Sequence, residues 1–237
     1  MTETRTSHHD AGLHRLLDRA GVYDALQDLL LRKGSRERYV SEHVRPFPGC
    51  RILDIGCGPG AILAHLPDSI GQYTGFDMNA AYIEAARRRW GNRGTFSCRR
   101  VEAATLPAGD IYDIVLANGI VHHLDDAEAS QLFDIAWRAL RPGGWLVTYD
   151  NVYLENQHWF ARWLIARDRG NAVRSREGYE ALARSRFAQV ESAILHDTLR
   201  VPYTILVMRC TKTGDSTTCC STRFEPGAAP VASTPAH

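Results

Sequence analysis

Short apolar runs alternate with longer stretches of helical spacing along residues 50–210. Seven segments have the length and apolar content of strands: 51–55, 73–77, 95–101, 112–117, 145–150, 187–196 and 204–209. Apolar residues spaced by three and four predict helices over 35–44 and 126–140, and a further helix opens at Asn79. Strands that alternate with helices in this way predict an α/β fold built on a mainly parallel sheet.

The two ends of the chain differ from this pattern. Residues 1–12 are polar, and residues 13–31 carry a helical apolar stripe that is interrupted near Gly21. The helix predicted over 35–44 stops ahead of Pro46, because proline lacks the N–H that a helix needs. Beyond residue 210, Thr, Ser, Pro, Gly and Ala dominate, so residues 211–237 are predicted to be disordered and without a catalytic role.

The most informative local pattern is a strand that runs directly into three alternate glycines, Arg51-Ile-Leu-Asp-Ile-Gly-Cys-Gly-Pro-Gly60. Residues 61–66, which follow it, have helical character. Glycine permits positive φ and lets a ligand approach the main chain, so strand, turn and helix predict a backbone-lined ligand socket. The spacing Gly56-x-Gly58-x-x-Ala61 is also that of dinucleotide-binding proteins, which leaves an NAD(P)-dependent oxidoreductase open.

An acid at the end of the next strand adds to this pattern. Asp77 follows Gly56 by 21 residues, close to the interval of about 20 at which an acid meets a ribose in dinucleotide folds. Its carboxylate can accept hydrogen bonds from both ribose hydroxyls. The alternative is a helix cap, because a helix opens directly behind it at Asn79.

Asp54 lies two positions before the first glycine, Pro59 lies within the turn, and Asp77 ends the next strand. With these residues the stretch resembles motif I of the class I S-adenosylmethionine (SAM)-dependent methyltransferases. The resemblance implies SAM as cofactor and a Rossmann-like seven-stranded sheet, mostly parallel with an antiparallel last strand and with helices on both faces. It also implies a helical lid over 1–48, a SAM-binding domain over 49–210 with a substrate-side insertion at about 152–186, and a tail over 211–237.

The resemblance implies roles for individual residues of the cofactor site. Met78 corresponds to the apolar residue that lies on the adenine. Glu102, where the family usually has Asp, corresponds to an acid that accepts from the adenine amino group; a surface glutamate is the alternative. Asn118 would contact the methionine part of SAM, and Gly119 would let sulfonium and acceptor approach. The implied cofactor-binding residues are Asp54, Gly56, Cys57, Gly58, Gly60, Asp77, Met78, Glu102, Ala103, Asn118 and Gly119.

The segment after the fourth strand supplies the candidate catalytic residues, His122 and His123. Histidine has an unperturbed pKa near 6.5, so either residue can take a proton from a hydroxyl or an amine at neutral pH. Orientation or packing is the alternative role. The segment lacks the Asn/Asp-Pro-Pro-Tyr/Phe motif of methyltransferases that act on planar adenine, cytosine or glutamine nitrogens.

The acceptor side is less defined, and its candidate substrate-binding residues are Tyr23, Asp150, Trp159 and Tyr203. Trp159 belongs to a helical aromatic stripe that also fits a core helix, and Tyr203 also fits a strand anchor. If Arg167, Arg169 or Arg174 faces inward, it would hold a carboxylate or phosphate; a solvated charged face is the alternative.

Composition narrows the class of partner. Lys and Arg number 28 against 27 Asp and Glu, a net charge of +1. The chain is therefore not expected to have a general positive electrostatic potential that would bind nucleic acid. No apolar run reaches transmembrane length and no signal-peptide core is present, which predicts a cytoplasmic protein without a membrane partner. The six cysteines lack C-x-x-C spacing, so no zinc site is expected.

The sequence therefore predicts a metal-independent SAM-dependent methyltransferase that acts on a small-molecule acceptor, with O-methylation first and N-methylation second. An NAD(P)-dependent oxidoreductase and a non-catalytic SAM-binding subunit are the alternatives, and a homodimeric state is left open.

Overall fold

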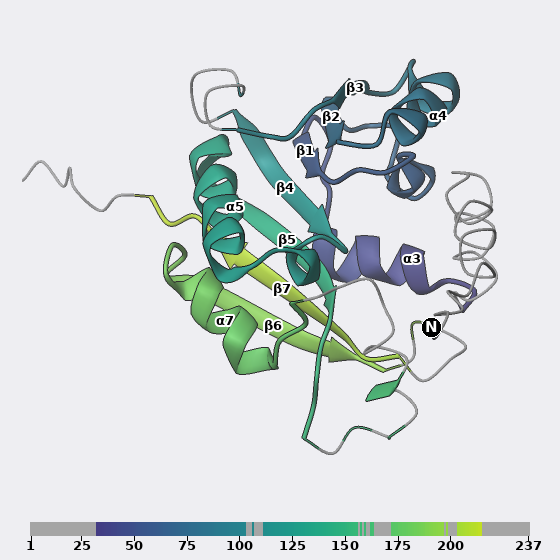
Figure 1. The fold of residues 1–237 in the computed structure, drawn as a ribbon. Helices are drawn as coiled ribbons and strands as arrows, with labels where there is room; N and C mark the ends of the chain where they lie inside the picture. Colours follow the sequence, from purple (N-terminus) through teal and green to yellow (C-terminus); the bar gives the residue numbers. More distant parts are fainter. Residues whose placement is uncertain are drawn as a thin grey trace, which may run out of the picture.

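The computed structural model describes residues 32–102, 106, 111–155, 157, 159, 162–163, 172–196, 198 and 203–214. Its strands form one seven-stranded sheet in the order β3-β2-β1-β4-β5-β7-β6 (Figure 1). The strands are β1 (Arg51–Ile55), β2 (Gln72–Asp77), β3 (Thr95–Cys98), β4 (Tyr112–Asn118), β5 (Leu140–Asn151), β6 (Gln189–Leu195) and β7 (Ile205–Thr211). Among them β7 alone runs antiparallel to its neighbours, which confirms the predicted Rossmann-like sheet.

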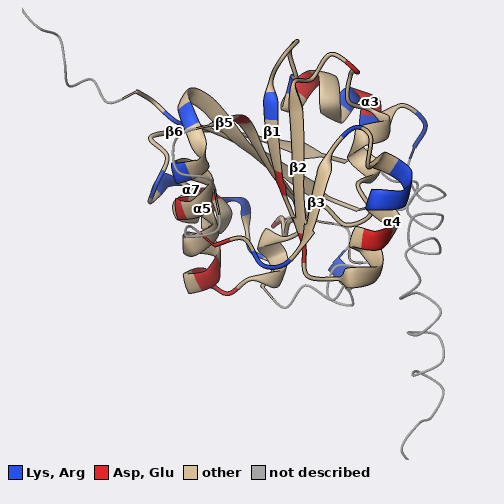
Figure 2. Ribbon diagram, turned by 90° about the horizontal axis from the view of Figure 1, so that it is seen from above, with Lys and Arg blue, Asp and Glu red and all other residues tan. Residues whose placement is uncertain are grey.

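Helices cover both faces of the sheet, with α5 (Asp126–Ala139) and α7 (Arg176–Arg184) on one side and α3 (Ser35–Tyr39) and α4 (Ala80–Trp90) on the other (Figure 2). The alternation of side chains along each strand produces this arrangement. Leu53 and Ile55 of β1 belong to the apolar cluster under α5 and α7. Ile52 belongs to the cluster under α3 and α4. Two apolar cores therefore fix the sheet between two helical layers.

The helix predicted over 35–44 forms, although its second half is wider than an α-helix. A π-helical turn, Val40–Val44, follows α3 directly. The indole N–H of Trp145 on β5 donates to the carbonyl oxygen of Val44 at 3.0 Å. This contact anchors the helical segment to the sheet. Residues 1–31, which include the rest of the expected lid, lie outside the described residues, as do residues 215–237 of the expected tail.

Two predicted segments are shorter in the structure. The helix expected over 61–66 is a single 3₁₀ turn, Ala61–Ala64. The guanidinium of Arg93 donates to the carbonyl oxygens of Leu63 and Leu66 at 2.7 and 3.0 Å, and Pro67 follows, so helix propagation stops there. The strand expected over 95–101 ends at Cys98, because its partner β2 ends at Asp77, opposite that residue.

The described helices are short: the longest has 14 residues. Within the described part of the chain, none has the length and apolar content needed to cross a membrane.

Candidate functional site

The glycine turn after β1 has the conformation that its sequence predicts. Gly56, Gly58 and Gly60 have φ values of +77°, +53° and +74°. Residues that carry a Cβ rarely adopt such positive φ values. A Cβ at Gly56 would lie 2.9 Å from Cδ1 of Ile120. A Cβ at Gly58 would meet no atom within 4 Å. The turn thus packs against the segment after β4 at Gly56 and faces open space at Gly58.

The turn is attached to the end of β2 by hydrogen bonds. The amides of Gly56 and Cys57 donate to the carbonyl oxygen of Phe76 at 2.8 and 2.9 Å. The amide of Gly58 donates to Oδ2 of Asp77 at 3.0 Å. The main chain of β1 and the carboxylate that ends β2 are therefore held together at one edge of the sheet.

Asp77 does not cap the helix that follows it. Its Oδ1 accepts from the amide of Asn79 at 2.7 Å, which forms a tight turn between strand and helix. The cap of α4 is Asn79, whose side chain accepts from the amides of Ala81 and Tyr82. The alternative of a helix cap for Asp77 is therefore wrong, and its role toward a ribose stays a prediction.

Asp54 lies beneath the turn as a buried carboxylate, with 3% of its surface exposed. The hydroxyl of Tyr73 donates to its Oδ2 at 2.6 Å. Its Oδ1 is buried without a hydrogen-bond partner in the described structure. Burial raises the pKa of Asp54 from an ordinary 3.8 to about 7, the Tyr73 hydrogen bond lowers it, and the charge of Asp77 raises it. An ionised Asp54 is therefore a poorly compensated negative charge directly below the glycine turn.

Asn118, at the end of β4, is oriented by a residue of α3. The hydroxyl of Tyr39 donates to its Oδ1 at 2.5 Å. The ring of Tyr39 also packs edge-to-face on Tyr149 of β5, with centroids 5.1 Å apart. Because Oδ1 is used as the acceptor, the amide nitrogen of Asn118 remains available as a donor. Gly119 follows with φ of +68°, and its amide donates to the carbonyl oxygen of Tyr149 at 2.7 Å.

The two candidate catalytic histidines have different environments. His122 is buried, and its Nδ1 lies 2.8 Å from Oδ1 of Asp150. The amide of His122 donates to the same oxygen at 3.1 Å. His123 is exposed, with its ring centroid 4.1 Å from that of His122. The structure thus gives His122 a buried carboxylate partner at the end of the neighbouring strand.

Two of the remaining predicted cofactor residues, Met78 and Glu102, have exposed side chains. Met78 is 73% exposed next to Asp77, and Glu102 is exposed beyond the end of β3. Cys57 is buried within the turn. Ala103 lies outside the described residues.

Not all of the predicted substrate-binding residues lie within the described part of the chain. Tyr203 lies just before β7, and its hydroxyl accepts a hydrogen bond from the side-chain nitrogen Nδ2 of Asn151 at 3.1 Å. Trp159 is 71% exposed, so the alternative of a core position for it is wrong. Tyr23 lies outside the described residues.

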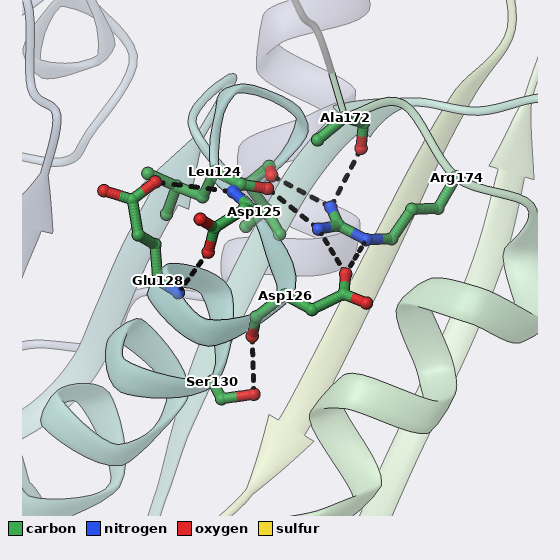
Figure 3. A network of polar contacts seen from close by, with 8 residues as sticks. Leu124, Asp125, Asp126, Glu128, Ser130, Ala172 and Arg174 are labelled. Carbon is green, nitrogen blue, oxygen red and sulfur yellow. Dashed lines mark hydrogen bonds and ion pairs between the residues drawn. The ribbon is translucent and has the colours of Figure 1, made fainter.

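Arg174 faces inward, and the carboxylate that it holds belongs to Asp126 of the same chain (Figure 3). Its side chain is only 12% exposed. Its Nε and one terminal nitrogen lie 2.9 and 2.7 Å from Oδ1 of Asp126, and its terminal nitrogens donate to the carbonyl oxygens of Val121, Leu124 and Ala172. It therefore binds the segment before α7 to the segment after β4. Arg167 and Arg169 lie outside the described residues.

Sequence reasoning missed the role of Tyr73 and the partners of Arg174, which both shape this edge of the sheet. Tyr73 binds the carboxylate of Asp54, and Arg174 joins two loops that are about 50 residues apart in the chain. Neither contact has a local sequence signal, because each depends on how the strands are ordered in the sheet. Within the described part of the chain no group of three or more His, Cys, Asp and Glu side chains is arranged to hold a metal ion.

Comparison with known proteins relates the chain to methyltransferases. A family model described as a methyltransferase domain matches residues 52–144. The ubiquinone biosynthesis O-methyltransferase of Chelativorans sp. (strain BNC1) is 34% identical over 102 residues, which are 42% of this chain and 40% of that protein. An uncharacterized methyltransferase of Mycobacterium bovis is 28% identical over 164 residues, which are 67% of this chain and 74% of that protein.

Structural comparison agrees at the level of the fold. Phosphoethanolamine N-methyltransferase 2 of Haemonchus contortus, solved with phosphomonomethylethanolamine and S-adenosylhomocysteine, has a TM-score of 0.67 at 15% identity, over 89% of this chain and 62% of that chain. The matches cover 30%, 3%, 40% and 3% of the first four relatives, so the chain spans less than half of the length of each. In its matched domain, its strand order and its glycine turn, the chain is similar to the class I SAM-dependent methyltransferases.

Proposed function

We propose that the protein transfers a methyl group from SAM to a small-molecule acceptor, with an oxygen acceptor first and a nitrogen acceptor second. The observation that carries this proposal is the turn of three positive-φ glycines, held by the carboxylate of Asp77 at the C-terminal edge of the sheet. In doubly wound sheets ligands bind at this edge, where the strand order reverses. Here the reversal lies between β1 and β4, which lead into the turn and into Asn118.

The side chains at this edge fit the chemistry of SAM. Gly58 leaves open space over the main chain. Among the described contacts, Tyr39 uses the side-chain oxygen of Asn118, so its side-chain nitrogen can donate to a carboxylate. The ionised form of Asp54 would attract a cation to the turn. When bound, SAM supplies a methyl group on a cationic sulfur, from which an acceptor lone pair displaces it. Because this donor is already activated, the task of the protein is to hold the reacting groups in line.

The small-molecule acceptor is supported by the balanced charge of the chain and by the names of its relatives. The Chelativorans relative is named for an O-methylation in ubiquinone biosynthesis. The Haemonchus contortus enzyme was solved with phosphomonomethylethanolamine. The lid over 1–48, the insertion at about 152–186 and metal independence belong to the same proposal. A cytoplasmic location and a homodimer stay predictions.

Isothermal titration calorimetry with SAM, S-adenosylhomocysteine and NAD tests the cofactor. We expect heat with the first two ligands and none with NAD. Asp77→Asn should weaken SAM binding by roughly 10–100-fold, since a hydrogen bond to a charged group is worth about 1.5–3 kcal/mol. The matched control is Glu84→Gln on the exposed side of α4, where Glu84 pairs with Arg88, and its affinity should be that of the wild type. No heat with either SAM or its demethylated product would refute the proposal.

A screen of phenols, amines and sugars with methyl-labelled SAM tests the reaction. We expect a labelled product together with S-adenosylhomocysteine, and the same turnover in the presence of EDTA. SAM binding without turnover on any acceptor would instead favour a non-catalytic SAM-binding subunit. Loss of turnover in EDTA that is restored by a metal would overturn metal independence.

A further inference from the structure

Two arginines lie beside the indole of Trp145, at the edge of the sheet opposite the glycine turn. Trp145 is near the start of β5 and Arg209 is near the end of β7, and the two strands are antiparallel, so both residues come to the same edge. Cζ of Arg209 lies 4.5 Å from the centroid of the Trp145 ring. The indole N–H donates to the carbonyl oxygen of Val44 at 3.0 Å, and Arg45 is the next residue of the chain. Both arginines therefore flank one aromatic ring.

Arg209 has a partly buried guanidinium without an anionic partner in the described structure. Its Nε is sealed from solvent and makes no hydrogen bond there. Its terminal nitrogens are not among the sealed atoms, and no described residue accepts a hydrogen bond from them or forms an ion pair with them. Glu191 lies opposite Arg209 on β6, but it is exposed and forms no ion pair with it. The terminal N–H groups of Arg209 are therefore available to an acceptor from solution.

Arg45 likewise carries a charge that no carboxylate balances among the described contacts. Its Nε donates to the carbonyl oxygen of Glu42 at 2.6 Å, which leaves its terminal nitrogens exposed. Its φ of +51° is the one positive value of a non-glycine residue in the described part of the chain. The amide of Arg45 closes the π-helical turn by donating to the carbonyl oxygen of Val40 at 2.8 Å. Glycine or asparagine usually occupies a helix end of this kind, so the turn itself does not require an arginine.

The two charges act on each other in the free protein. Burial lowers the pKa of Arg209, and the charge of Arg45 lowers it further, although a guanidinium stays protonated at any ordinary pH. A third guanidinium, that of Arg141, lies over the neighbouring ring of Phe47, and the carboxylate of Asp113 balances it. Two positive charges thus remain at this edge, which suits an anion that carries two negative charges.

We propose that Arg45 and Arg209 form a binding site for the phosphate group of a small molecule, separate from the methyl-transfer site. A phosphate monoester carries about −1.5 to −2 charges near neutral pH and has three acceptor oxygens, and guanidinium groups bind such oxygens bidentately. A single carboxylate would leave one of the two charges unbalanced. Tyr149, whose carbonyl oxygen binds the amide of Gly119, is four residues further along β5 than Trp145, roughly 13 Å at about 3.3 Å per residue. The inference therefore goes beyond methyl transfer, and the failure of either leaves the other standing.

Nitrogen NMR of the full chain labelled with ¹⁵N-arginine tests the site directly. Inorganic phosphate is the probe, at constant ionic strength and about pH 8, where it is mainly a dianion. The Nε–H signals of Arg45 and Arg209 are identified by their absence from the spectra of Arg45→Gln and Arg209→Gln. We expect both signals to shift along one saturable curve. Sulfate should shift them in the same way, whereas acetate, with one charge, should bind roughly 10-fold or more weakly.

Substitutions test whether both guanidiniums contribute. Arg45→Gly removes the side chain and suits the positive φ of this position, so the variant should fold at least as well as the wild type. We expect it to weaken phosphate binding, followed at the Arg209 signal, by roughly 10–100-fold, as for the loss of hydrogen bonds to a charged group. Arg209→Lys keeps the charge without the planar fork and should recover only part of the affinity. The control is Arg88→Gln on α4, where Arg88 is exposed and pairs with Glu84; it should bind phosphate as the wild type does.

The possible outcomes decide the proposal. Signals that do not move with phosphate, an unchanged affinity in Arg45→Gly, or equal affinities for acetate and phosphate would overturn it. Glycerol 3-phosphate, and vesicles of phosphatidic acid in phosphatidylcholine, separate a soluble phosphate ester from a lipid headgroup. Binding to the vesicles without any shift in glycerol 3-phosphate would overturn the assignment to a small molecule. Calorimetry with SAM on Arg45→Gly should give the wild-type affinity, because the arginine pair lies at the opposite edge of the sheet from the glycine turn.

Discussion

Replacement of Asp54 by asparagine should stabilise the folded chain at alkaline pH. Burial raises the pKa of this carboxyl to about 7, against an ordinary 3.8. An acid with a higher pKa in the folded chain binds its proton more tightly there, so its contribution to stability is complete below about pH 4 and is lost as pH rises through about 7. The difference of about three pKa units corresponds to about 4 kcal/mol, of which roughly 2–3 kcal/mol falls between pH 5 and pH 8.5.

The substitution keeps the shape of the side chain and removes the titration. The amide oxygen can still accept from the hydroxyl of Tyr73, which lies 2.6 Å from Oδ2 in the wild type. The amide carries no charge at any pH in this range. The free energy of unfolding of Asp54→Asn, minus that of the wild type, should therefore rise by about 2–3 kcal/mol from pH 5 to pH 8.5.

Urea denaturation followed by fluorescence, at several pH values, measures this difference. The wild type and the variant are compared without ligand, so that ligand binding does not contribute. Asp134→Asn serves as the control, because its half-exposed carboxylate lies on α5, and its difference from the wild type should not follow the same course. A difference that stays constant, or that falls as pH rises, would show that Asp54 is not a destabilising buried charge.

Three further substitutions test the packing around the site by urea unfolding. Gly75→Ala should cost about 1–3 kcal/mol, since its Cβ would lie 2.7 Å from Sγ of Cys57. Cys57→Ala in the same chain removes that sulfur and should recover part of the loss, because Cβ of residue 57 and Cδ1 of Phe96 stay 3.0 and 3.1 Å away. The full cost in the double variant would contradict this contact. Arg174→Ala should cost about 2–4 kcal/mol, because it leaves Asp126 and three carbonyl groups without their donor; a full rescue by Arg174→Lys would argue against the need for a planar fork. Ser175→Ala should cost about 1 kcal/mol as the lost cap of α7, and an unchanged midpoint would show that another group satisfies that amide.

Most of the fold could be predicted because its strands carry their own signal. All but the last residue of β4 is buried, and such continuous apolar runs are typical of strands covered on both faces. The helix predicted over 126–140 likewise has its signal in neighbouring residues: it forms as α5, with Asp125 as its N-cap. The 61–66 segment was misjudged, because the Arg93 side chain that ends its short turn comes from beyond α4. A local pattern cannot show a contact of that kind.

The candidate site was predictable only where its residues are neighbours in sequence. The glycine turn could be located from its sequence alone, because each of its three glycines adopts a positive φ that other residues rarely adopt. The pairing of Asp54 with Tyr73, in contrast, depends on the parallel register of β1 and β2. The pairing of His122 with Asp150 likewise depends on β4 and β5 being adjacent. Sequence alone therefore named most of these residues without showing which ones act together.

The two buried carboxylates at this edge of the sheet, Asp54 and Asp150, have different hydrogen-bond partners. Each gives one oxygen to a protein donor and keeps the other buried without a partner. Asp54 is held by a phenolic hydroxyl that stays neutral, because burial and the charge of Asp54 raise the pKa of Tyr73 well above its usual value. Among the described contacts, therefore, no cation balances an ionised Asp54. Asp150 is held by both the main-chain amide and the imidazole of His122, at 3.1 and 2.8 Å. The first arrangement favours a cationic ligand on the glycine turn, and the second joins the end of β5 to the turn after β4.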